Sequence, residues 1–211
     1  MADHTYDAQP RVTATTTGAA TLCIAATCWA IAVTQMRGMD MGVDTTLGSF
    51  GFFVGVWAAM MAAMMLPGTV PAVSTFARTH RRVGATTMFV AAYVAVWTLF
   101  GVAAYAVYRP HSTTAAGVVT IAAGLYELTP IKQRARQRCR QPVSSGFHLG
   151  LHCMRSSIGL MLLLLALGAM SIAWMAVIAA LVVVQKLFPP RRTVDAAIAL
   201  ALVAFGVVIL T

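Results

Sequence analysis

The chain alternates long apolar runs with short polar or basic segments, a pattern typical of membrane-spanning helices. Several runs are long enough to cross a hydrocarbon core of about 30 Å as an α-helix. The pattern predicts seven spans, at about residues 17–35, 47–66, 85–107, 113–129, 146–167, 170–187 and 194–210. The break between Gly168 and Ser171 is short, so residues 146–187 form either two spans or one bent segment. We predict an all-α fold, a polytopic transmembrane helical bundle over residues 17–211, preceded by a polar tail over residues 1–16.

Composition agrees with this interpretation. Hydrophobic residues make up 59% of the chain and charged residues only 10%, which is too little polar surface to cover a soluble globule. The formal net charge of +9 would suggest nucleic-acid binding in a soluble protein. In a membrane protein, a bias of Lys and Arg towards the cytoplasmic side explains the excess, so we expect a lipid bilayer and no nucleic acid as partner.

The basic residues also predict an orientation. Twelve lie on the N-terminal tail and in the loops after the second, fourth and sixth spans, whereas the alternate loops carry only two. This bias predicts that the N-terminus lies on the inner, cytoplasmic side and the C-terminus on the outer side. Termini on opposite sides require an odd number of spans, and seven is odd. The twelve are Arg11, Arg78, Arg81, Arg82, Lys132, Arg134, Arg136, Arg138, Arg140, Lys186, Arg191 and Arg192; the two are Arg37 and Arg109.

A polar stripe interrupts the fifth predicted span. His148, His152 and Arg155 fall within about 60° on a helix, so they share one face. An ionisable residue in a span normally turns to the bundle interior and meets a partner. Glu127 is the only acid in the interior of a predicted span, since Asp195 lies at the very start of the last one, so we expect Glu127 and Arg155 to form a buried ion pair.

The stretch MMAAMM, residues 60–65, raises the question of metal binding. Its four methionines span an arc of about 140° on a helix and can all address the same neighbours. Thioethers and thiols select soft ions such as Cu(I), and imidazole also suits copper, although adaptable apolar packing explains methionines equally well. The predicted orientation places them at the same membrane depth as the histidines. The candidate ligands are Met60, Met61, Met64, Met65, His148, His152 and Cys153, with a possible outer capture group at Met36, Met39 and Met41.

Three stretches carry a resemblance to a known family. WAAMMAAMMLPGTVP (57–71), AGLYELTPIKQRARQRCRQP (123–142) and GLHCMRSSIGLMLLLLALGAMSIAWM (150–175), with QKLFP (185–189), resemble a family of predicted metal-binding integral membrane proteins of unknown function. The resemblance covers roughly residues 50–190 and implies a polytopic helical protein. The family's Cys-x-Gly-Cys-Cys cluster is matched here only at Cys153, and the basic loop keeps Cys139.

Two functions follow as expectations. The first is a membrane-embedded protein that binds, handles or delivers a soft metal of the copper type, with a metalloenzyme as client. The second is a non-catalytic accessory or assembly subunit of a larger membrane complex, whose glycine-rich helices pack against other subunits through Gly51 and Gly55 and through Gly117 and Gly124. The chain shows no Walker-type glycine loop and no His-Glu-x-x-His pair, so an enzyme has little support. We expect an integral protein of a bacterial-type cytoplasmic membrane.

Overall fold

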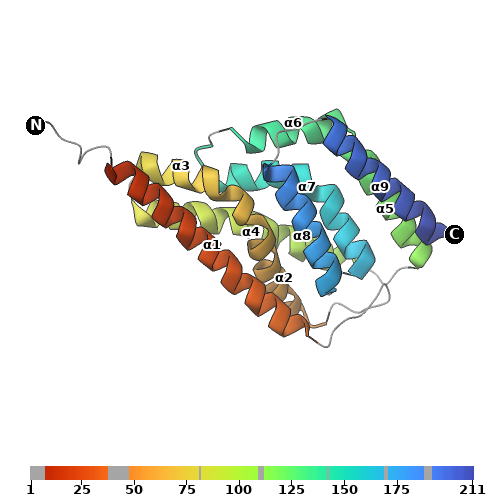
Figure 1. Ribbon diagram of the computed structural model, residues 1–211. Coiled ribbons are helices and arrows are strands. Elements are labelled where there is room, and N and C mark those ends of the chain that lie inside the picture. Colours follow the sequence, from red (N-terminus) through yellow and green to blue (C-terminus); the bar gives the residue numbers. More distant parts are fainter. Residues whose placement is uncertain are drawn as a thin grey trace, which may run out of the picture.

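A computed structural model describes residues 8–37, 48–80, 82–108, 112–141, 143–168, 171–187 and 192–211. In these ranges the chain is helical and contains no strand. Figure 1 shows the arrangement of the helices. Their bounds are α1 Ala8–Met36, α2 Phe50–Met65, η1 Pro67–Thr69, α3 Val70–His80, α4 Val83–Val107, α5 Thr113–Glu127, α6 Pro130–Cys139, α7 Gly146–Gly168, α8 Ile172–Leu187 and α9 Arg192–Leu210.

The all-α prediction is confirmed, and every predicted span corresponds to a helix. Four helices are long and apolar enough to cross a membrane, within α1, α4, α7 and α9. The number rises to six if two bent pairs of helices each count as one span. The remaining apolar helix, α8, is shorter, so seven crossings and their orientation stay a prediction.

Two helices were not predicted, and both continue a span after a bend. The first pair turns by 47° between α2 and the segment Pro67–His80, and the second by 66° between α5 and α6. Each new segment starts at a proline, which has no N–H to donate and suits the first turn of a helix. At the second bend the hydroxyl of Thr129 also accepts a hydrogen bond from the backbone N–H of Lys132.

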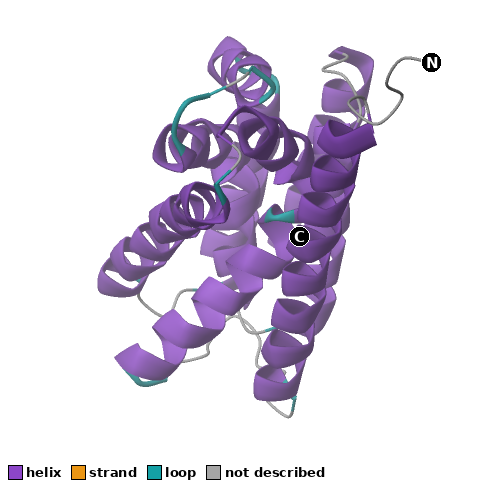
Figure 2. Ribbon diagram, turned by 90° about the vertical axis from the view of Figure 1, so that its left-hand side faces the viewer, coloured by secondary structure: helices purple, strands orange, loops and turns teal. Residues whose placement is uncertain are grey.

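The segment 146–187 forms two separate helices. α7 ends at Gly168, whose φ of 118° is a conformation that only glycine adopts readily. α8 starts at Ile172 and packs against α7 (Figure 1). This finding answers the question that the short break left open in the sequence. Figure 2 shows the bundle from another side, as helices joined by loops.

Small residues let α5 and α9 pack closely. A Cβ on Gly124 would lie 3.0 Å from the carbonyl oxygen of Ala199, and one on Gly206 would lie 3.0 Å from that of Gly117. The two helices run side by side in Figure 1. Gly117 and Gly124, which the accessory-subunit hypothesis assigned to partners, are therefore used within the chain.

The surface of the bundle is apolar, as expected for contact with lipid. Met88 and Leu99 on α4 are 70% and 62% exposed, and Leu200 and Val208 on α9 are 72% and 69% exposed. Exposing so much apolar surface to water is unfavourable in free energy, whereas contact with lipid hydrocarbon is not. The fold is thus compatible with membrane insertion.

Candidate metal centre

The methionines of MMAAMM lie in the middle of the bundle. All four are at most 1% exposed and belong to the apolar core. α2 is fixed against α4 by Trp57, whose indole N–H donates to the carbonyl of Trp97 at 2.9 Å. All four methionines therefore occupy packing positions, and the sulfur of Met65 in addition contacts the ammonium of Lys186.

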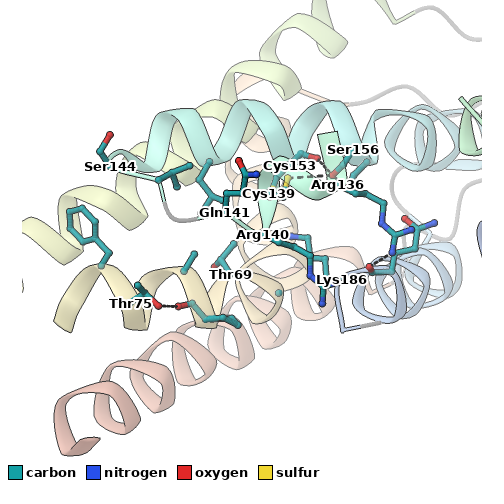
Figure 3. A pocket seen from close by; sticks show the side chains of 18 of the residues that line it. Thr69, Thr75, Arg136, Cys139, Arg140, Gln141, Ser144, Cys153, Ser156 and Lys186 are labelled. Atoms are coloured by element: carbon teal, nitrogen blue, oxygen red, sulfur yellow. Dashed lines mark hydrogen bonds between the residues drawn. The ribbon is translucent and has the colours of Figure 1, made fainter. Parts of the chain in front are cut away.

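Two cysteines from different helices meet beside this core. Cys139 is the last residue of α6, and Cys153 lies in the second turn of α7, which packs against α6. Both are free thiols, and both line the same cavity. Cys139 is also 3.8 Å from the hydroxyl oxygen of Ser156, and Figure 3 shows the two cysteines with Ser156.

The thiols line a cavity of about 510 Å³ between α3, α6, α7 and α8. Cys153 is 2% exposed, and Cys139 is half-buried. We call this cavity the thiol pocket. Polar side chains including Thr75, Thr79 and Arg140 also line it. Figure 3 shows Thr75 and Arg140 with the two cysteines.

A single ammonium group is held next to the thiols. Lys186 Nζ donates to the Met65 carbonyl at 3.3 Å and lies 3.7 Å from the Met65 sulfur. It also donates to the Tyr93 hydroxyl at 3.4 Å, and the Tyr93 side chain is buried. The stem of Lys186 crosses Gly68, where an added Cβ would stand 2.1 Å from Lys186 Cδ.

A second polar cluster lies where α5, α6 and α8 meet. Glu127 forms an ion pair with Lys132, and both side chains are at most 1% exposed. Gln185 joins them, donating to Glu127 at 2.7 Å and accepting from Lys132 at 3.1 Å. Burial lowers the pKa of Lys132, and the Glu127 carboxylate opposes that shift. The predicted pair of Glu127 with Arg155 is wrong, because Arg155 is exposed and Lys132 takes its place.

The same cluster extends to α9. Arg136 forms an ion pair with Asp195, which is 2% exposed, and donates to the backbone carbonyl of Gln185. We call the set Glu127, Lys132, Arg136, Gln185 and Asp195 the polar network. It fixes one face of α6 against α5, α8 and α9, and thereby sets where Cys139 lies.

The other predicted ligands do not reach the thiol pocket. His148 is exposed and His152 half-buried, and neither lines the cavity. Met36 is buried in the core, and Met39 and Met41 lie outside the described residues. Of the predicted set, the structure brings Cys153 to the pocket and Met65 beside it.

Sequence reasoning missed three residues of the site. Cys139, Tyr93 and Lys186 were not among the candidate ligands. In the sequence, Cys139 lies at the end of a basic segment that begins with Pro130, and this position is the feature that could have identified it. Within the described ranges no three His, Cys, Asp or Glu side chains converge.

A comparison with protein families gives one match. Residues 54–209 match the family described as "PpoB2: Copper chaperone", and this range includes the thiol pocket, the polar network and MMAAMM. Searches of the curated proteins and of the solved structures gave no match.

Proposed function

Because the chain belongs to this copper chaperone family, we propose that it binds Cu(I) between Cys139 and Cys153 and passes the ion to a client protein. The observation that carries the proposal is that two free thiols from different helices line one cavity, with the hydroxyl of Ser156 3.8 Å from the Cys139 sulfur and donating to the Cys153 carbonyl. Copper is the cargo, and the chain supplies the ligands that hold it.

The donor set fits Cu(I). Thiolates and thioethers prefer soft ions, and Cu(I) accepts two thiolates in a linear arrangement. Cys139 and Cys153 would be the two thiolates, and Met65 offers a thioether nearby through its contact with Lys186. Both thiols must lose their protons for the metal to bind, so loading releases protons to the polar side of the pocket.

Transfer requires only ligand exchange. One thiol of the client replaces one cysteine and a second thiol replaces the other. Each incoming thiol loses its proton, each released cysteine takes one up, and the copper stays Cu(I) throughout. The half-buried Cys139 is the more accessible thiol and would be displaced first, whereas Cys153 is almost fully buried. Nothing in this exchange needs an enzyme-like acid or base.

We place the protein in the membrane with the basic end of the bundle inside. The apolar outer surface of α4 and α9 supports insertion, and the charge bias supports the orientation. A single cysteine at exposed Ser112 should react with an impermeant maleimide in intact cells, and one at exposed Arg134 should not. The reverse labelling pattern would overturn the orientation.

Copper content tests the proposed site. The purified protein is loaded with Cu(I) under reducing conditions and washed with a Cu(I) chelator. We expect about one retained copper per chain, and a loss of at least about a hundredfold in affinity for Cys139→Ser or Cys153→Ser, because each removes one of two strong ligands.

The α1 cysteines provide a matched control. Cys23→Ser and Cys28→Ser remove a thiol outside the thiol pocket and should leave copper binding unchanged. X-ray absorption of the loaded wild type should show copper bound to sulfur. Full copper retention by the Cys139→Ser, Cys153→Ser double variant would overturn the proposal.

One observation favours the second function, an accessory subunit. Gly51 and Gly55 on α2 are exposed, and nothing lies within 4 Å of a Cβ added at either. Spaced four residues apart, such glycines allow another helix to approach closely in a membrane. This function predicts that Gly51→Leu with Gly55→Leu reduces the size of the complex in mild detergent, and that the wild type holds no copper.

A further inference from the structure

We propose that Lys186 makes the thiol pocket selective for monovalent soft cations, so that it takes Cu(I) or Ag(I) in preference to Zn(II) or Cd(II). The inference rests on the proposed function, since it concerns ions held by Cys139 and Cys153. Lys186 would act through its fixed positive charge and would not itself bind the metal.

The position of the ammonium group supports this role. Its three contacts are the Met65 carbonyl, the Met65 sulfur and the Tyr93 hydroxyl, none of which carries a negative charge. The ion pairs among the described residues are Glu127 with Lys132 and Arg136 with Asp195, so Lys186 meets no carboxylate there. A half-buried ammonium without a counterion is unfavourable in an apolar surrounding.

The charge of Lys186 acts on both thiols. Lys186, Cys139 and Cys153 line the same cavity, and the hydrogen bonds to Tyr93 and to the Met65 carbonyl hold the ammonium beside it. In such a partly buried site, the field of one ammonium reaches both sulfur atoms. An anion formed at the thiol pair would therefore supply the counterion that Lys186 lacks.

Counting charges shows which ions fit. Two thiolates with Cu(I) or Ag(I) carry a net charge of −1, which the ammonium balances to zero. Arg140 also lines the pocket, but its side chain is exposed, so water screens its charge. Two thiolates with Zn(II) or Cd(II) are neutral, so the site would keep the uncompensated charge of Lys186. At the separations of such a pocket, one unit charge changes relative affinity by on the order of ten- to a hundredfold.

The fold holds this charge in place. The backbone of Gly68 leaves room for the lysine stem, because a side chain there would overlap Lys186 Cδ. Met65 is the last residue of α2, and its carbonyl is one that a helix end leaves without an intrahelical partner. Lys186 thus also caps α2, and a test must separate this structural role from the electrostatic one.

Two isoelectronic pairs of ions provide the test. Affinities of the purified full chain are measured for Cu(I) and Zn(II), and for Ag(I) and Cd(II), by chelator competition. The two ions of each pair have the same number of electrons and differ by one unit of charge. Lys186→Met removes the charge, and Lys186→Arg keeps it.

We expect Lys186→Met to lower the ratio of Cu(I) to Zn(II) affinity, and that of Ag(I) to Cd(II), by about ten- to a hundredfold. Lys186→Arg should keep both ratios near those of the wild type. Arg134→Gln, which removes an exposed positive charge from α6 and spares the pocket, should change neither ratio. Thermal unfolding in detergent reports the capping role separately.

Three outcomes would overturn the inference. Equal losses of monovalent and divalent ions in Lys186→Met would indicate a structural role alone. Unchanged ratios in that variant would show that its charge does not set selectivity, while copper bound by Cys139 and Cys153 would still support the proposed function. A wild type that binds none of the four ions would overturn both proposals together.

Discussion

The polar network and the thiol pocket lie on neighbouring parts of α6, yet their polar groups are satisfied in different ways. In the network, Glu127 faces Lys132 and Asp195 faces Arg136, so each buried charge has an opposite partner. In the pocket, the Lys186 ammonium meets only neutral acceptors. A buried cluster whose charges are balanced serves to hold helices together, whereas one that lacks a counterion leaves room for a ligand.

The largest expected effect comes from breaking the network at its centre. Glu127→Gln leaves Lys132 buried without a negative partner, which should cost about 3–5 kcal/mol of stability. Removing both charges, with Lys132→Met, should recover part of this loss because no isolated charge remains. Unfolding in mild detergent measures both variants.

Arg155 provides the control for this prediction. Its side chain is exposed, so Arg155→Gln should change stability by less than about 0.5 kcal/mol. A loss as large as that of Glu127→Gln, with a double variant that recovers it, would show that Glu127 pairs with Arg155 after all.

The outer end of the network should matter less. Asp195→Asn removes the charge opposite Arg136 but keeps an acceptor, and Arg136 retains its hydrogen bond to the Gln185 carbonyl. We expect a loss of about 2 kcal/mol, the scale of a hydrogen bond to a charged group. The same unfolding measurement checks it, and a loss exceeding that of Glu127→Gln would contradict the ranking.

The methionines allow a sharper comparison within one helix. Met65→Leu removes the sulfur that faces Lys186 and should lower Cu(I) affinity by about threefold if its thioether assists the thiolates. Met60→Leu with Met64→Leu changes only core packing, so it should cost less than about 1.5 kcal/mol and leave copper unchanged. If Met60→Leu with Met64→Leu lost copper and Met65→Leu did not, the core methionines would be the copper ligands.

The smallest effect is expected at the histidines. His148 and His152 lie outside the thiol pocket, so His148→Ala with His152→Ala should leave both stability and Cu(I) affinity near the wild-type values. Chelator competition and unfolding measure the two quantities. A tenfold loss of Cu(I) affinity would restore them as candidate ligands.

The sequence predicted the elements of this protein well and their contacts poorly. The apolar runs placed all seven long helices, because an extended apolar stretch satisfies its backbone in lipid only as a helix. The amphipathic helices α3 and α6 were missed, since a short basic or mixed segment after a proline also resembles a loop. Cys139 was missed with α6, because its partner lies fourteen residues further on, in another helix.

The sequence by itself determined that the chain is helical, that its outer surface is apolar, and that Glu127 must be buried with a cation. Only the tertiary structure decided which cation, and which thiols meet. The 66° bend between α5 and α6 turns Lys132 towards Glu127 and carries Cys139 to Cys153. Such contacts depend on the bend and rotation of each helix, and because one residue turns a helix face by about 100°, periodicity within a single helix does not determine them.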